Sequence, residues 1–284
     1  MRSTSPHRSA RIVALVLAIG FSSASAWGQE KPEGVPKVEP PAAEAKKDQA
    51  GEPARKDEEK AKPLVPVNAA VVPEPRSAAW LRQHEGFLER GRRGEVDLLF
   101  LGDSITNGWN GAGGIWSRYY APRKAANFGI GGDRTQHVLW RLDNGEVDAI
   151  KPKVVVLMIG TNNLGRNSED EVAEGVKAVV DRLRSKLPGS KVLLLGIFPR
   201  GSNRDKTVPT VGPDPRIARI NARIAGLDDG RAVRYLDIGA HFLDDAGQVS
   251  RTIMPDFLHL NRAGYQIWAD AIEPKLWDMM AESP

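Results

Sequence analysis

The sequence contains no cysteine among its 284 residues. This absence excludes a disulfide framework, a thiolate metal site and a cysteine nucleophile, so the fold has to rest on its own apolar core. The chain also lacks an excess of one charge: without three arginines near its N-terminus, 37 basic residues stand against 36 acidic ones. A chain so close to neutrality has no global field that attracts nucleic acid or an anionic membrane, and we expect neither as a partner.

Long apolar runs are missing as well, with one exception near the N-terminus. The run Ile12–Phe21 follows Arg2, Arg8 and Arg11 and precedes the small residues Ala24–Ala26. It is shorter than the ~20 residues that span a bilayer, but this order of basic, apolar and small residues is typical of a secretory signal peptide. We assign residues 1–26 to a signal peptide, with an uncleaved N-terminal anchor as the alternative. Both predict an exported protein (periplasmic, cell-surface or secreted) without a further membrane span.

Aromatic residues are absent from Gln29 to Pro75, a stretch rich in Pro, Ala, Glu and Lys. Such a stretch buries too little apolar surface to offset the entropy lost on ordering. We interpret residues 27–76 as a disordered spacer. Residues 77–284 then form one domain, which is large enough for a sizeable core.

Within this domain, apolar runs rich in β-branched residues alternate with helical patterns. The predicted strands are Val96–Leu101, Lys124–Ile130, Val154–Ile159, Val192–Ile197 and Val233–Ile238. Nearly continuous apolar runs suit strands that are buried on both faces of a parallel sheet. The alternation predicts an α/β fold, a three-layer α/β/α sandwich around a five-stranded parallel sheet.

Helix-capping residues stand between these strands. Asp133 with Gln136, and Ser168 with Glu171, have the spacing of helix N-termini, the second as a capping box. Two further helix starts are expected at Asp214-Pro215 and at Asn261.

Polar clusters follow the predicted strands at the edge where open α/β sheets bind ligands. Ser104 ends the first strand, Gly132 follows the second, Asn162 follows the third, and Asp256 and His259 precede the last helix. Each cluster alone is also what an ordinary turn or helix cap looks like. Their convergence on one edge of one sheet favours a functional site.

A serine hydroxyl needs a base before it acts as a nucleophile, and imidazole is suited to that task near neutral pH. Four histidines follow the predicted signal peptide. His84 precedes the sheet, His137 falls inside a helical pattern where a structural role is expected, and His241 remains a weak rival. Only His259 has an acid, Asp256, three residues before it, a spacing at which the carboxylate can reach Nδ1 and leave Nε2 for the serine.

Two of these clusters offer donors for a tetrahedral oxyanion. The turn at Gly129–Gly132 exposes backbone N–H groups, and Asn162 carries a side-chain amide. A tight βα turn or an anion cradle is the simpler interpretation of the glycines. Their G-x-G-G spacing departs from the dinucleotide fingerprint, no G-x-S-x-G elbow surrounds Ser104, and no H-E-x-x-H motif is present. The sequence therefore predicts neither a cofactor nor a metal.

Taken together, Gly102–Ser104, Gly132, Asn162, Asp256 and His259 resemble the sequence blocks of the GDSL, or SGNH, hydrolases. Asn127–Asn163 and Gly196–Gly201 further resemble the catalytic subunits of intracellular platelet-activating-factor acetylhydrolase. The resemblance extends over about Val96–Ala281.

The resemblance implies a flavodoxin-like α/β/α fold and serine esterase chemistry. It makes Ser104 the nucleophile, His259 the base and Asp256 its orienting partner, with Gly132, Asn162 and the Ser104 amide as the oxyanion hole. Two departures stand out: Asn163 occupies a position where many members carry Asp, and the predicted signal peptide is foreign to the intracellular subunits. Their substrate and regulatory partner are therefore not carried over.

The sequence thus predicts an exported serine esterase that cleaves short acyl esters, acetyl above all, of a small molecule, carbohydrate or lipid. Acyl transfer to a sugar hydroxyl and a non-catalytic binding module are the alternatives. The aromatic rings of Trp109 and Trp116 are candidates to line the site, with core packing as the other interpretation. Because the related subunits dimerise, a homodimer is compatible with the resemblance.

Overall fold

The computed structural model describes residues 67–202 and 207–281. The predicted signal peptide and most of the predicted spacer lie outside the described residues. Within those two ranges, none of the helices combines the length and the hydropathy needed to cross a bilayer.

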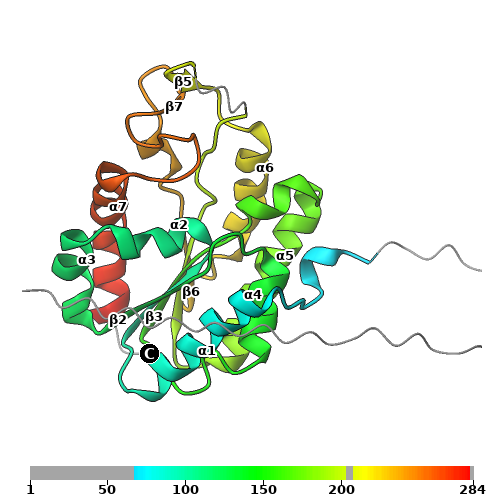
Figure 1. The fold of residues 1–284 in the computed structure, drawn as a ribbon, viewed down its shortest axis with the longest axis vertical. Helices are drawn as coiled ribbons and strands as arrows, with labels where there is room; N and C mark the ends of the chain where they lie inside the picture. The colour runs from blue at the N-terminus through cyan, green and yellow to red at the C-terminus, as the bar shows by residue number, and fades with distance from the viewer. Residues whose placement is uncertain (1–66, 203–206, 282–284) are drawn as a thin grey trace, which may run out of the picture. The chain divides into compact units, whose positions relative to one another are not determined.

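A single parallel sheet of five strands, in the order β2-β1-β3-β4-β6, forms the centre of the domain (Figure 1). Its strands are β1 (Leu98–Gly102), β2 (Ala125–Gly129), β3 (Val154–Met158), β4 (Lys191–Leu195) and β6 (Val233–Leu236). All five predicted strands are confirmed. The register places Gly102 beside Gly129 and Met158, so the carboxyl ends of three neighbouring strands lie level. A two-stranded antiparallel sheet of β5 (Thr210–Val211) and β7 (Val249–Ser250) was not predicted.

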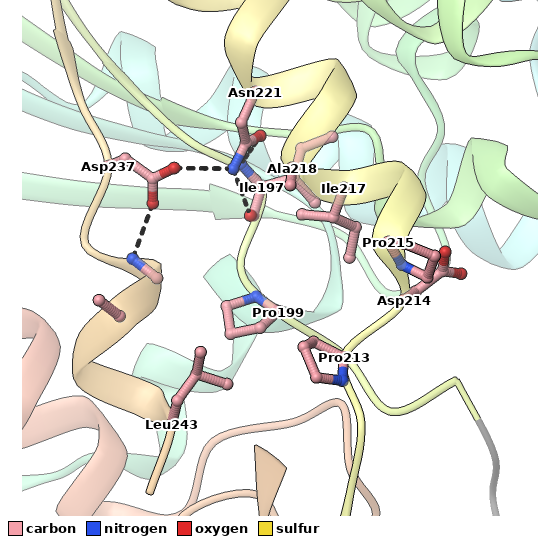
Figure 2. Close-up of a pocket in the computed structure, with 12 residues that line it drawn as sticks. Ile197, Pro199, Pro213, Asp214, Pro215, Ile217, Ala218, Asn221, Asp237 and Leu243 are labelled. Carbon is pink, nitrogen blue, oxygen red and sulfur yellow. Dashed lines mark hydrogen bonds between the residues drawn. The ribbon is translucent and has the colours of Figure 1, made fainter. Parts of the chain in front are cut away.

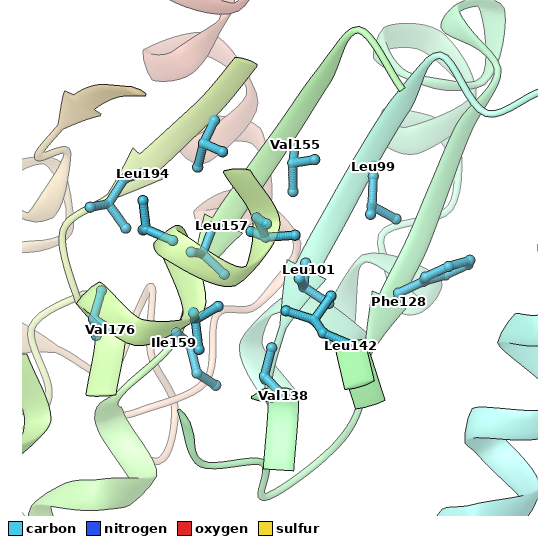
Figure 3. Packing of buried hydrophobic residues seen from close by; sticks show 14 of the residues in the cluster. Leu99, Leu101, Phe128, Val138, Leu142, Val155, Leu157, Ile159, Val176 and Leu194 are labelled. Atoms are coloured by element: carbon cyan, nitrogen blue, oxygen red, sulfur yellow. The ribbon is translucent and has the colours of Figure 1, made fainter. Parts of the chain in front are cut away.

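The sheet separates two apolar clusters, one on each face. Leu99 and Leu101 of β1 point into the first cluster, and Leu98 and Phe100 point into the second, because side chains alternate along a strand. The helices are α1 (Ala78–Arg92), α2 (Ser104–Asn107), α3 (Gly114–Tyr119), α4 (Thr135–Asp143), α5 (Glu169–Lys186), α6 (Pro215–Ile224) and α7 (Arg262–Ala281). Helices α4, α5 and α6 contribute to the first cluster, part of which Figure 3 shows, and α3 and α7 to the second. The predicted three-layer fold is confirmed.

Most predicted helix starts are confirmed. Ser168 and Glu171 form the expected capping box at the start of α5, and Asp214 caps α6. Asn261 precedes α7 and accepts a hydrogen bond from the Gly264 amide at 3.1 Å. The predicted cap Asp133 is wrong by one residue: Arg134 occupies the N-cap position of α4, and the Asp133 carboxylate forms ion pairs instead.

The structure also corrects the N-terminal boundary of the domain. Part of the segment assigned to a disordered spacer is ordered, beginning with the 3₁₀ turn Ala69–Val71. Ala70 is fully buried, and its carbonyl accepts a hydrogen bond from the Thr135 hydroxyl at 2.7 Å. The Glu74 amide donates to the Gln136 carbonyl at 3.2 Å. The composition that predicted disorder missed this docking because a few specific contacts, rather than a continuous apolar face, hold the segment.

Candidate active site

Ser104 is the first residue of α2, and only Asp103 separates it from the end of the interior strand β1. The buried Asp103 caps this short helix, because its Oδ1 accepts a hydrogen bond from the Ile105 amide at 2.9 Å. Burial raises the pKa of Asp103 to about 7. Gly102 lets the helix turn away so sharply, since a Cβ at that position would lie 2.3 Å from the Met158 carbonyl oxygen. The serine hydroxyl is thereby presented, half-buried, at the carboxyl edge of the sheet.

A chain of hydrogen bonds joins three of the predicted site residues. Ser104 Oγ lies 2.8 Å from Nε2 of His259, which is 155 positions further along the sequence. The other ring nitrogen, Nδ1, lies 2.7 Å from Oδ2 of Asp256. With Asp256 ionised, Nδ1 carries the proton and Nε2 is left as an acceptor for the serine hydroxyl. The geometry is that of a serine nucleophile with its base and an orienting acid.

The turn from Asp256 to His259 is held mainly by its own polar groups. Asp256 Oδ1 accepts hydrogen bonds from the amides of Leu258 and His259 at 3.1 and 2.8 Å. Partial burial works to raise the pKa of Asp256, but hydrogen bonds from the His259 side chain and backbone outweigh it and keep the pKa below its usual value. Phe257 adopts a φ of +60°, a left-handed conformation that bulky residues seldom take. Its ring is buried.

Gly132 lies in the tight turn that follows β2. The Asp133 amide donates to the Ile130 carbonyl at 3.2 Å, and Gly132 has a φ of +77°, which glycine adopts at little cost. A Cβ at Gly131 would lie 4.0 Å from the Ser104 Cβ, so this turn runs directly beside the serine. The structure thus brings the predicted glycine turn and Ser104 together.

Asn162 and Asn163 follow β3 in the 3₁₀ segment Thr161–Gly165, and their side chains have different hydrogen-bond partners. The half-buried Asn162 donates one amide hydrogen to the Asp133 carbonyl at 2.9 Å, which leaves the other for a ligand. Asn163 is buried and binds both the Thr135 amide and the Gln136 side chain. The Asn at this second position is therefore structural, and it ties the segment to the start of α4.

Beneath the glycine turn lies a buried network of charges. Asp133 Oδ1 accepts hydrogen bonds from Trp80 Nε1 at 2.7 Å and from Arg76 Nη1 at 3.0 Å, and Arg141 Nε lies 3.0 Å from Oδ2. Arg141 also pairs with the buried Glu146. Burial raises the pKa of Asp133, and the two guanidinium groups and the indole oppose that shift. Sequence reasoning missed these partners, because Arg76 and Trp80 lie more than 50 positions from Asp133.

The remaining histidines have other surroundings. His137 is buried in α4, and its Nδ1 accepts a hydrogen bond from the Arg134 amide at 3.0 Å. Burial, followed by the nearby arginines, lowers its pKa to about 3, so it stays neutral. His84 is buried and its Nε2 bonds the Asn144 carbonyl, while His241 is exposed. Among the described residues, His259 is the one histidine hydrogen-bonded to Ser104.

The two tryptophans after the serine belong to the core. Trp109 is buried, and its ring centroid lies 5.1 Å from that of Trp268 and 6.0 Å from that of Phe100. Trp116 is partly buried against the same cluster. Of the two interpretations from the sequence, core packing is the one that these contacts support.

Two cavities open along the same edge of the sheet. A polar one of about 310 Å³ adjoins Asn162 and is lined by Thr161, Arg200 and Arg216 among others. An apolar one of about 430 Å³ lies between α6 and the loops after β4 and β6, and Figure 2 shows Pro199 and Leu243 facing into it. None of the five predicted site residues lines the apolar cavity.

The fold is an open parallel sheet, and Ser104, His259 and Asp256 form a hydrogen-bonded cluster beside its carboxyl edge. Residues 100–267 match the profile of the GDSL-like Lipase/Acylhydrolase family. The chain belongs to this family, and its class is that of hydrolases acting on esters. The turn at Ser104, the glycine turn, the Asn162 segment and the turn from Asp256 to His259 all lie within the matched residues.

Curated relatives and solved structures agree with this assignment. The chain is 37% identical over 209 residues to platelet-activating factor acetylhydrolase IB subunit alpha2 of Rattus norvegicus, covering 72% of this chain and 86% of the relative. It is 36% identical to subunit alpha1 of Homo sapiens, covering 72% and 85%. A GDSL-like lipase from Bacteroides thetaiotaomicron shares the fold, with a TM-score of 0.56 at 17% identity, covering 69% of this chain and 97% of that one.

Proposed function

We propose that this chain is an exported serine esterase that hydrolyses short acyl esters, acetyl esters in particular, of a carbohydrate, lipid or other small molecule. The observation that carries the proposal is the hydrogen-bonded chain from Ser104 through His259 to Asp256. A binding module has no need for a serine, a histidine and an aspartate joined by hydrogen bonds. The alternative of a non-catalytic module is therefore not favoured.

In this mechanism, Ser104 Oγ attacks the ester carbonyl while His259 Nε2 takes its proton. Asp256 keeps the proton of His259 on Nδ1 and stabilises the imidazolium that forms. The carbonyl oxygen becomes an oxyanion, and the Gly132 amide, the Ser104 amide and the free N–H of Asn162 donate to it. Each such donor contributes on the order of a hundredfold or more in rate.

The tetrahedral intermediate then collapses. The C–O bond to the alcohol breaks, the alcohol takes the proton from His259, and the acyl group stays on Ser104 as an ester. Water attacks this acyl-enzyme with His259 again as base, releasing the acid and restoring the serine. No step needs a metal or a cofactor.

Two observations support the finer parts of the proposal. The curated relatives are named as acetylhydrolases, which favours a small acyl group. The basic and apolar order of residues 1–26 favours export. The platelet-activating factor in the relatives' names is not carried over, because that substrate belongs to those proteins.

Hydrolysis of p-nitrophenyl acetate, butyrate and octanoate by the full chain tests the activity. We expect acetate to be the best substrate, and Ser104→Ala to lose the activity while Ser117→Ala, an exposed serine on α3, keeps it. Equal rates in wild type and Ser104→Ala, or no rate in either, would contradict the proposal. If turnover required an added sugar and yielded the acylated sugar, the chain would be a transferase.

Expression of the full chain in a bacterial host, followed by fractionation and mass spectrometry of its N-terminus, tests the export. We expect an exported protein that begins at Trp27. A cytoplasmic protein that keeps residues 1–26 would contradict it.

A further inference from the structure

The turn that carries Gly132 is held from outside by one arginine. Arg76 Nη1 donates to the Gly131 carbonyl at 2.8 Å and to Asp133 Oδ1 at 3.0 Å. A Cβ at Gly132 would lie 3.1 Å from Arg76 Nη2, so the guanidinium packs against the glycine as well. Arg76 thus contacts every residue of the segment from 131 to 133.

Through the geometry of the peptide bond, this contact also fixes the direction of the Gly132 N–H. The Gly131 carbonyl and the Gly132 N–H belong to one planar trans peptide and point in opposite directions. A donor that fixes the carbonyl on one side therefore fixes the N–H on the other. A positive φ at the third position, as at Gly132, is that of a type II turn, and rotation of the central peptide converts such a turn to type I. That rotation would reverse the direction of the Gly132 N–H.

Asp133 links this peptide to the second candidate donor. Its carboxylate is buried and binds Arg76, and its own carbonyl accepts the hydrogen bond from Asn162 Nδ2 at 2.9 Å. Trp80 and Arg141 hold the carboxylate from the other sides. Both donors are consequently oriented through one fixed residue.

We propose that Arg76 is a positioning residue of the oxyanion hole: it clamps the Gly131–Gly132 peptide so that the Gly132 N–H faces the substrate carbonyl. The inference rests on the proposed esterase function. Arg76 does not touch the substrate, and it acts through the Gly131 carbonyl and through Asp133.

Arg76 comes from a segment outside residues 100–267, which match the family profile. That segment is docked on the domain: Asn68 Nδ2 donates to the Glu171 carbonyl at 3.2 Å, and Ala70 is buried. The Arg76 side chain is one-third exposed, so the clamp is a contact at the rim of the site. The N-terminal segment therefore completes a site whose other parts lie within the family profile.

Arg76→Gln and Arg76→Lys test the clamp in the full chain. Arg123→Gln is the matched control, because Arg123 also forms a partly buried ion pair, with Glu273, but precedes β2 at the other end of the sheet. We expect Arg76→Gln to lower kcat for p-nitrophenyl acetate about tenfold with little change in KM, since a donor is misaligned rather than removed. Arg76→Lys should recover part of that loss, because an ammonium can still donate to the carbonyl.

Hydrogen exchange measured by mass spectrometry gives a second readout that needs no activity. Without substrate, Arg76→Gln should speed exchange in the peptide covering residues 127–137, and Arg123→Gln should not. Unchanged exchange in Arg76→Gln, or an equal loss of kcat in Arg123→Gln, would overturn the clamp. A wild-type chain that does not hydrolyse esters would overturn the proposed function, and the exchange experiment would still decide the clamp.

Discussion

Asp133 and Asp256 each orient a group beside Ser104, but their surroundings differ. The Asp133 side chain is fully buried and binds two arginines and a tryptophan, whereas the Asp256 side chain is 50% exposed and binds its own turn and His259. Oxyanion donors have to keep one fixed direction, so a buried ionic network suits them. In the proposed mechanism His259 gains and loses a proton at each turnover, and Asp256 contacts it from a turn at the protein surface. In the proposed mechanism the buried Asp133 network would therefore hold the oxyanion donors, and the exposed Asp256 would orient the base.

The largest expected effect is on activity, and it comes from a change at the exposed Asp256. Asp256→Asn should lower kcat about 10⁴-fold, because the amide no longer holds the Nδ1 proton. Its unfolding free energy should change by less than about 1 kcal/mol, as is usual for exposed ion pairs. Steady-state kinetics and urea denaturation check both. Asp244→Asn is the control, since Asp244 caps a similar exposed turn without a histidine. A large loss of stability in Asp256→Asn would contradict the comparison.

The next largest effect is on stability, and it comes from a change at the buried Asp133. Asp133→Ala leaves Arg141 and Arg76 without their shared carboxylate, and removing one partner of a buried ion pair costs about 3–5 kcal/mol. The midpoint of urea unfolding should fall accordingly. If Asp133→Ala were as stable as the wild type, the buried network would not be what holds the glycine turn.

A smaller effect is expected at Asn162, the second proposed oxyanion donor. Asn162→Ala should lower kcat about a hundredfold and leave the unfolding midpoint nearly unchanged, because the half-buried side chain donates only to the Asp133 carbonyl. Asn167→Ala, in which another asparagine near the same segment is removed, gives the reference value. Equal kcat values for the two variants would exclude Asn162 from the oxyanion hole.

The smallest effect concerns pH and Asp103. The pKa of Asp103 is raised to about 7 in the folded chain, so between about pH 4 and 7 the unfolded chain loses a proton that the folded chain retains. The unfolding free energy of the wild type should fall over that range relative to Asp103→Asn, and the difference should become constant above pH 7. Urea denaturation at each pH measures it, with the exposed Asp278→Asn as control. A pH-independent difference would contradict the raised pKa.

The sequence predicted the sheet well because buried parallel strands have a strong local signature. The same applies to the caps Ser168 and Asp214, whose partners lie within three residues. The cap at Asp133 was wrong for the opposite reason: partners more than 50 positions away claim its carboxylate.

For the candidate site too, residues with a local sequence signal were predicted and residues with only distant partners were not. Ser104, Asp256 and His259 were predictable because they fall at strand ends or at a three-residue spacing that has a chemical meaning. The hydrogen bond between Ser104 and His259 confirms that they meet. Arg76 and the docked segment around Ala70 were missed, since a lone arginine in a proline-rich stretch carries no local sign of its contacts. Trp109 stayed ambiguous because burial, and not residue type, decides between core and pocket.

In the proposed mechanism Ser104 is a nucleophile that His259 and Asp256 activate, and the donors held by Asp133 stabilise the oxyanion. Reaction of the full chain with a p-nitrophenyl phosphonate, followed by peptide mapping, tests it most directly. We expect one phosphonylated residue, Ser104, with labelling slowed in both Asp256→Asn and Asn162→Ala. A label on another residue, or labelling at the wild-type rate in both variants, would contradict it.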